Sequence, residues 1–268
     1  FKRLDVVNVN EPGKTYFPVR EDKKQALKEL YQAEILAFDS FFGSFIEKLK
    51  DMELYDNAMI ILVSDHGEEF YEHGGWGHSH SLYDELVRVP LAIKFPKSRY
   101  RGKRISRPVG LVDVMPTVLS YYKIKYRAGD LDGENLLPIL ENRDKEKKRH
   151  VVTSISTGRY FNALPPKIAV YSGEYKLIYN EPFSQSDIEF YKAFAKPPRP
   201  PRFQLFNLAQ DPGETVNTAR SHEKIKSGLM KILIPQRNLM MKKITEAGKR
   251  KKKLDPESQK QLESLGYL

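Results

Sequence analysis

The first sixty residues carry an apolar pattern that predicts one long helix followed by a buried strand. Apolar side chains recur at helical spacing between about residues 20 and 50, namely Leu27, Leu30, Phe38, Phe41, Phe45 and Leu49. The opposite side of this segment is charged, so we expect one face of the helix to pack on a sheet. The apolar run from Ala58 to Ser64 is unbroken, as is typical of a strand in a parallel sheet covered on both faces.

The pattern of predicted helices and strands changes near residue 150. A short strand is predicted at 91–95, and a helix capped by Asp113 follows it. Beyond residue 150 the pattern predicts short strands at 151–155, 168–171, 175–179 and 204–207, separated by turns, and then an amphipathic helix from about Glu223. The sequence therefore predicts an α/β fold: residues 1–150 form the later part of a mainly parallel sheet with flanking helices, and residues 151–268 form a small antiparallel sheet with a C-terminal helix.

Composition narrows the classes of function. The 268 residues contain no cysteine, which excludes disulfides, thiolate metal ligands and a cysteine nucleophile within this sequence. The net charge is +10, but residues 242–253 hold seven Lys or Arg and one Glu and so supply +6 of it. Since no aromatic side chain interleaves with this run, we expect a solvated segment and no nucleic-acid partner. No apolar run approaches the roughly 20 residues that a membrane span needs.

The sharpest chemical feature is a group of histidines just after the predicted strand at 58–64. Four of the six histidines lie between residues 66 and 80, namely His66, His73, His78 and His80. The strand delivers Asp65 and His66 to its carboxyl end, where ligands bind in open α/β sheets. A turn at Gly67 would let the carboxylate and the imidazole converge on one cation. We therefore predict Asp65 and His66 as metal ligands, with the remaining ligands coming from elsewhere.

Other interpretations of this region stay open. Asp65 would otherwise cap a turn, with His66 as a hydrogen-bonded loop residue. His78 and His80 are candidates to donate hydrogen bonds to an oxyanion or to protonate a leaving oxygen, and a second metal held by His73, His78 and His80 is the alternative. The nearby carboxylates are interpreted as surface groups, with Glu68 also a candidate partner of a metal ligand; they are Glu68, Glu69 and Glu72.

At these residues the sequence resembles the sulfatase family of the alkaline-phosphatase superfamily. The stretch 54–68 is similar to the family's metal-binding strand and loop, and 77–91 is similar to its neighbouring active-site segment. Weaker similarities follow in the family's order at 111–117, 132–138, 173–178, 205–208, 211–217 and 265–268. Asp-His-Gly alone also occurs in phosphodiesterases and phosphoethanolamine transferases, so the ordered set is what favours sulfatases.

The resemblance implies an alkaline-phosphatase-like fold and the hydrolysis of sulfate esters by a formylglycine hydrate. Formylglycine is made from Cys or Ser in a Cys/Ser-x-Pro-x-Arg motif, which this sequence lacks. We therefore expect the chain to be the carboxy-terminal half of its parent, starting inside a longer chain. The nucleophile would lie in a missing N-terminal half, which becomes its partner, and the chain alone would be inactive.

The resemblance also assigns roles to particular residues. Asp65 and His66 match the second pair of ligands to one divalent ion, usually Ca²⁺, with Mn²⁺, Mg²⁺ and Zn²⁺ as alternatives. His80 matches the residue that contacts the sulfate or the leaving oxygen, and His78 is the competing assignment. The resemblance is compatible with a periplasmic or extracellular location, although the sequence itself indicates no compartment.

Three alternatives to a sulfatase remain. Many sulfatases have Asn where this chain has His66, while phosphonate monoester hydrolases and some sulfatases have His. An imidazole suits Mn²⁺ or Zn²⁺ better than Ca²⁺. A phosphonate or phosphate-ester hydrolase is therefore one alternative, and a phosphoethanolamine transferase of the same superfamily is another. The third is a non-enzymatic binding domain that retains the fold.

Overall fold

The computed structural model describes residues 21–127, 129–143, 149–155, 164–183 and 200–249, together with Glu257 and Lys260. The chain divides into two compact units. One, here called the α1 unit, comprises Tyr16–His78 and Glu85–Lys147. The other, the sheet unit, comprises Phe1–Thr15, Ser79–Asp84 and Lys148–Leu268. Among the described residues, no helix combines the length and the apolar character that crossing a membrane requires.

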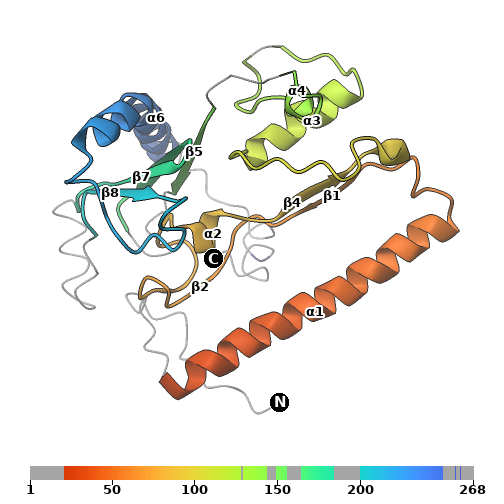
Figure 1. The fold of residues 1–268 in the computed structure, drawn as a ribbon, viewed down its shortest axis with the longest axis horizontal. Helices are drawn as coiled ribbons and strands as arrows, with labels where there is room; N and C mark the ends of the chain where they lie inside the picture. Colours follow the sequence, from red (N-terminus) through yellow and green to blue (C-terminus); the bar gives the residue numbers. More distant parts are fainter. Residues whose placement is uncertain are drawn as a thin grey trace. The chain divides into compact units, whose positions relative to one another are not determined.

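The α1 unit opens with the long helix that the apolar spacing predicts. Helix α1 runs over Glu21–Asp51, with acidic residues in its first turn and Lys48 and Lys50 in its last, which suits the helix dipole. Figure 1 shows it as a single uninterrupted helix. No residue of α1 is buried, however, and Leu36 and Phe41 are 70% and 72% exposed. The expected packing of its apolar face on a sheet is therefore not seen within the described part of the chain.

The strands of this unit form where the sequence predicts them but pair differently. Strand β1 (Ile60–Val63) pairs antiparallel with β4 (Leu91–Lys94), so the expected parallel pairing is wrong for these two strands. Between them the chain turns back through a two-stranded ribbon, β2 (Glu69–Phe70) with β3 (Trp76–Gly77), and a one-turn helix, α2 (Asp84–Val87). No crossover helix carries the chain over the sheet, and without one neighbouring strands run in opposite directions. Strand β1 is also only half-buried, not fully buried as its apolar run predicts.

Short helices complete the α1 unit: η1 (Pro96–Ser98), η2 (Leu111–Asp113), α3 (Val114–Tyr121) and α4 (Leu137–Leu140). Asp113 is buried, and its carboxylate does not cap α3 as the sequence suggests. It accepts hydrogen bonds from the backbone N–H groups of Gly110 (2.6 Å) and Glu134 (2.8 Å) instead. The Asp113 carboxylate therefore links the loop before α4, through Glu134, to the turn before α3, through Gly110.

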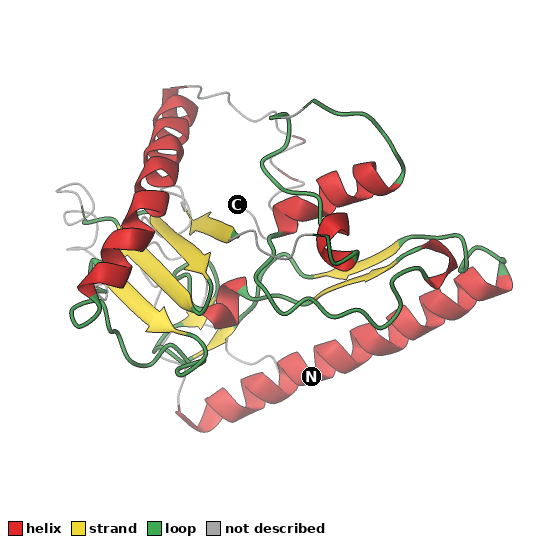
Figure 2. Ribbon diagram, turned by 45° about the horizontal axis from the view of Figure 1, so that its top comes forward, coloured by secondary structure: helices red, strands yellow, loops and turns green. Residues whose placement is uncertain are grey.

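The sheet unit matches its sequence prediction closely. Four antiparallel strands follow the order β5-β6-β7-β8, and they span His150–Ile155, Lys167–Ser172, Tyr175–Asn180 and Phe203–Asn207. Helix α6 (Glu223–Lys249) packs along this sheet, as Figure 2 shows. The core between them is apolar and almost fully buried; it includes Ile168, Val170, Leu177, Leu205, Leu229 and Leu233.

Candidate functional site

The candidate site lies where β1 ends and the chain enters its histidine-rich loop. The Ser64 hydroxyl donates to the His66 carbonyl at 2.7 Å, and the Gly67 N–H donates to the Leu86 carbonyl at 2.8 Å. A side chain at Gly67 would place its Cβ 1.9 Å from the Glu85 carbonyl oxygen. Glycine is thus required here because two backbone segments approach closely, which fixes the direction in which His66 leaves the strand.

Three side chains of metal-ligand type gather in this loop, each offering one atom within 4.8 Å of the others: His66, Glu68 and His78. The rings of His66 and His78 stack with their centroids 4.1 Å apart. Nδ1 of His78 lies 3.0 Å from Oε2 of Glu68. This hydrogen bond raises the pKa of His78 above its usual value, although partial burial acts in the opposite direction. Within the α1 unit the fold therefore joins two of the four clustered histidines to a carboxylate.

Asp65 lies beside this group and faces solvent. Its Oδ1 accepts from the His66 backbone N–H at 2.9 Å, and its Oδ2 is 3.8 Å from His66 Nε2. Two ligands that each bind one ion at about 2.0–2.6 Å lie no more than about 5 Å apart, so this spacing fits a shared cation. His66 Nδ1 is 2.8 Å from the Gly67 carbonyl, and a proton on Nδ1 would leave Nε2 as the ligand atom.

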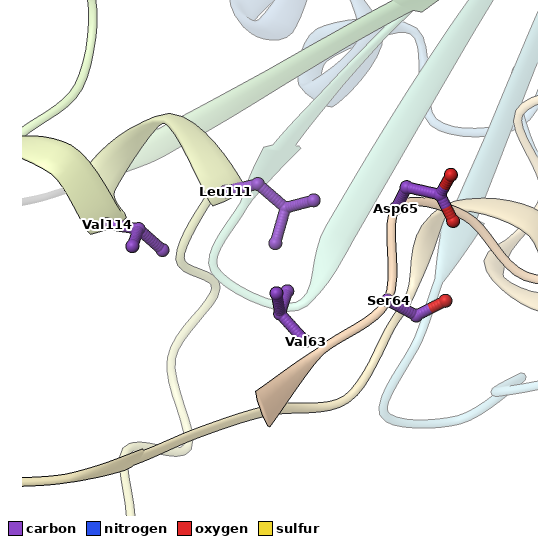
Figure 3. Close-up of a pocket in the computed structure, with 5 residues that line it drawn as sticks. All are labelled: Val63, Ser64, Asp65, Leu111 and Val114. Atoms are coloured by element: carbon purple, nitrogen blue, oxygen red, sulfur yellow. The ribbon is translucent and has the colours of Figure 1, made fainter. Parts of the chain in front are cut away.

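A hollow of ≈ 540 Å³ opens beside Asp65. Val63, Ser64, Asp65, Leu111 and Val114 line it, and Figure 3 shows the Asp65 carboxylate pointing away from the apolar side chains of Val63, Leu111 and Val114. Asp65 therefore borders a space large enough for a ligand, although its carboxylate is directed away from the apolar side. All five lining residues belong to the α1 unit.

The glutamates of the loop differ in burial and in their hydrogen-bond partners. Glu69 is 1% exposed, so its interpretation as a surface group is wrong: its Oε1 accepts from the backbone N–H groups of His73 (3.1 Å) and Gly75 (2.5 Å). Glu72 does lie at the surface, paired with Lys28 of α1 at 3.1 Å. Glu68 belongs to the metal-type group, although the sequence is interpreted mainly as placing it at the surface. Its position three residues after Asp65 is the feature of the sequence that could have identified it.

The other two histidines are not members of this group. The side chain of His73 is largely buried, and its Nδ1 lies 2.6 Å from Oε1 of Glu85, so it is engaged in a hydrogen bond. Among the described residues it belongs to no metal-type group, which gives no support to a second metal held by His73, His78 and His80. His80 belongs to the segment Ser79–Asp84 of the sheet unit. Its contact with a sulfate or a leaving oxygen stays a prediction.

Comparison with known proteins places the chain among sulfatases. A family model described as Sulfatase matches residues 9–124, and one described as N-sulphoglucosamine sulphohydrolase, C-terminal, matches residues 71–238. The chain is 30% identical over 213 residues to Arylsulfatase K of Gallus gallus, a match that covers 77% of this chain and 36% of that protein. It is 34% identical over 123 residues to the N-acetylglucosamine-6-O-sulfatase of Bacteroides thetaiotaomicron, which covers 46% of this chain and 22% of that protein.

The fold agrees with this assignment. A protein of Bacteroides fragilis assigned to the sulfatases superposes with a TM-score of 0.62 at 22% identity, over 85% of this chain and 47% of that one. The chain thus spans well under half the length of the curated relatives named above. It belongs to the sulfatase family, and it matches a carboxy-terminal portion of the family's alkaline-phosphatase-like fold.

Proposed function

We propose that this chain supplies part of the active site of a sulfuric-ester hydrolase. In this proposal Asp65 and His66 bind a divalent cation, and His78 or His80 meets the sulfate or the leaving oxygen. The observation that carries it is the 3.8 Å spacing of Asp65 Oδ2 and His66 Nε2 at the end of β1, in a chain of the sulfatase family. Adjacent residues can share an ion here because the Gly67 turn releases them from the strand's alternation.

The ligand atoms of Asp65 and His66 influence which metal ion would bind. Bound there, a divalent cation supplies positive charge that stabilises sulfate oxygens and lowers the pKa of a nucleophile. A carboxylate oxygen and an imidazole nitrogen suit Mn²⁺ or Zn²⁺ on ligand chemistry, whereas the family expectation is Ca²⁺. Two protein ligands do not complete a catalytic site, so further ligands would come from another part of the protein.

His78 is equipped to donate a proton or a hydrogen bond. Because Glu68 engages its Nδ1 and raises its pKa, the imidazolium form persists to higher pH and Nε2–H stays available as a donor. This contact supports His78 as the group that meets the leaving oxygen. The order of the family-like segments supports His80, so both assignments enter the test.

We further propose that another part of the same protein covers the apolar surface of the α1 unit and carries the nucleophile, formylglycine in the family. The support is the exposure of apolar side chains on one face of α1, namely Phe38, Phe41 and Phe45, and of Val63 at the end of β1. Exposed apolar side chains grouped on one face favour a site of contact.

The test is hydrolysis of 4-nitrophenyl sulfate by the full-length protein that contains this chain. We expect Asp65→Asn and His66→Ala each to lower kcat by at least a hundredfold, and chelation to abolish turnover until Ca²⁺, Mn²⁺ or Zn²⁺ is restored. Asp56→Asn, which alters an exposed aspartate before β1, is the matched control and should leave kcat unchanged. Normal turnover in both site variants would refute the metal role.

A phosphonate or phosphate-ester hydrolase is the second candidate, and the imidazole of His66 is what favours it. The full-length protein would be given a sulfate ester and a phosphonate ester with the same leaving group. A higher kcat/KM for the phosphonate would replace the sulfatase assignment. Absence of turnover on both, together with no effect of metal on the melting temperature, would point to a non-enzymatic domain.

A further inference from the structure

One short segment belongs to a different unit from the chain on either side of it. Ser79–Asp84 is part of the sheet unit, whereas His78 before it and Glu85 after it are part of the α1 unit. The segment begins directly after His78 and contains His80. Whatever holds it therefore sets the backbone position of a proposed active-site histidine.

A buried cluster of charges holds the end of this segment. Lys176 of β7 is fully buried, and its Nζ lies 2.8 Å from Asp84 Oδ1 and 2.7 Å from Glu214 Oε1. Glu214 Oε2 also accepts the backbone N–H of Asp84 at 2.5 Å, and the Tyr171 hydroxyl donates to Asp84 Oδ1 at 2.7 Å. Asp84 is thus fixed through both its side chain and its backbone.

A second, independent contact holds the preceding residue. Gln204 of β8 donates from Nε2 to the Tyr83 hydroxyl at 2.6 Å, while its Oε1 accepts from Asn180 at 2.9 Å. The Tyr83 ring lies 6.1 Å from that of Phe206, and Leu82 is buried. Residues 82–84 are consequently held by the strands β6, β7 and β8.

Stability alone does not account for a lysine and two carboxylates at this position. Replacement of a buried ion cluster by apolar side chains of similar volume often leaves the stability unchanged or raises it. Loss of one partner, in contrast, leaves a buried charge unpaired and lowers the stability. Buried charges do, however, permit few alternative arrangements, because each displaced ion loses its partner. The buried charge cluster is therefore suited to hold residues 79–84 in one position.

We propose that Lys176 and Glu214 are positioning residues, which act through Asp84 to hold Ser79–Asp84 and thereby place His80 for the reaction. The placement of His80 rests on the proposed function, whereas the holding of the segment does not. Neither Lys176 nor Glu214 is assigned contact with substrate. Glu214 closes the Asp-Pro-Gly-Glu turn that follows β8, so a residue 130 positions away in the chain sets this part of the site.

The experiment compares Glu214→Ala with Glu214→Gln in the full-length protein. Alanine removes the acceptor for the Asp84 N–H, whereas glutamine keeps an acceptor and the volume. We expect Glu214→Ala to speed amide exchange at residues 79–84 at least tenfold, to leave exchange in β7 slow, and to lower kcat at least tenfold. Glu214→Gln keeps the acceptor for Asp84 but loses the ion pair with Lys176, so it should give smaller changes than Glu214→Ala in both readouts.

Two further variants keep the test decisive. Lys226→Met breaks a lysine–glutamate pair at the surface of the same unit, Lys226–Glu223 at 2.5 Å, and should alter neither readout. If Glu214→Ala does not fold, Tyr171→Phe removes one hydrogen bond to Asp84 and keeps the ring; it should speed exchange at 79–84 at least threefold.

Each outcome decides one part of the proposal. Unchanged exchange at 79–84 in a folded Glu214→Ala or Tyr171→Phe protein would overturn the positioning role. Faster exchange with an unchanged kcat would overturn the link to His80. If the wild-type protein hydrolyses no sulfate ester, the proposed function fails, and exchange still decides whether Glu214 holds the segment.

Discussion

Gly67 lies where the loop of the candidate site passes closest to the backbone of residues 85 and 86. In Gly67→Ala the new Cβ would lie 1.9 Å from the Glu85 carbonyl oxygen, so backbone has to move. We expect a loss of about 1–3 kcal/mol in the free energy of unfolding, as overpacking commonly costs. Metal binding should weaken as well, because the same turn directs His66. Urea unfolding and metal titration measure the two effects.

Gly43 provides the matched control. It lies within α1, where an added Cβ meets nothing within 4 Å. Gly43→Ala should leave the stability unchanged or raise it by up to about 1 kcal/mol, since alanine favours helix. Equal losses in the two variants would show that the close approach at Gly67 does not matter.

Lys167 is a buried amine whose titration should be visible in the stability of the sheet unit. It is 7% exposed, and burial lowers its pKa from 10.5 to about 8. The unfolded chain thus binds the proton more tightly, and the stability of the folded state rises as the pH increases from about 8 to 10.5. Below pH 8 the folded state holds a buried ammonium, which costs roughly 3 kcal/mol at 1.36 kcal/mol per pKa unit.

Replacement of Lys167 tests this assignment. Lys167→Met should be more stable than the wild type at pH 7, and the difference should shrink by pH 10. Lys231→Met, which changes an exposed lysine of α6, should show no such convergence. The measurement is the free energy of unfolding in urea at both pH values. A difference that does not vary with pH would argue against a depressed pKa.

At the scale of elements, α1 presents an apolar face that its own unit leaves exposed. Its described contacts include the site loop, where the rings of Tyr31 and Phe70 form a T-shaped pair and Lys28 pairs with Glu72. We expect the isolated chain to self-associate through this face. Phe38→Lys with Phe41→Lys should shift sedimentation equilibrium toward monomer, because both side chains lie on this face and are more than half exposed.

A charge control separates apolar contact from simple repulsion. Glu34→Lys changes the charge by the same two units as the double variant and removes no apolar surface of comparable size. It should leave the association unchanged. A wild-type chain that stays monomeric at all concentrations would mean that this face is not a contact surface.

How far the sequence could predict these elements depends on the kind of information involved. The apolar pattern predicts α1, β1, β4, the four-stranded sheet and α6, because each reflects the local spacing or continuity of apolar residues. The direction in which β1 and β4 pair could not be predicted, because a four-residue apolar strand has the same sequence pattern in parallel and antiparallel sheets. The ribbon of β2 and β3, with two residues in each strand, is too short to leave a periodic signal.

The candidate site shows the same division. Asp65 and His66 stand out because they follow an apolar run and precede a glycine. The burial of Glu69 has no local signal, since it depends on backbone N–H groups that only the folded loop turns inward. Likewise, the contacts of Asp84 with Lys176 and Glu214 join residues about 90 and 130 positions away, which one sequence does not reveal.

At the scale of the whole molecule, the two proposed ligands of the cation belong to one unit. Asp65 and His66 are in the α1 unit, whereas the four-stranded sheet belongs to the other. A cation that binds only the folded site stabilises the unit that forms it, by about 2.7 kcal/mol at a hundredfold excess over Kd. Added Zn²⁺ or Mn²⁺ should therefore slow amide exchange in β1 and β4 and leave β6 and β7 unaffected.

His66→Ala should abolish this regional protection, while His222→Ala, in the sheet unit, should preserve it. The comparison of Ca²⁺ with Zn²⁺ and Mn²⁺ reports the ligand type: stronger protection by Zn²⁺ or Mn²⁺ means that the imidazole binds the ion. If Ca²⁺ protects best and His66→Ala still responds, the carboxylates bind it without the histidine. Uniform protection of both units would instead mean that the cation binds outside the loop that follows β1, and the assignment of Asp65 and His66 would fall.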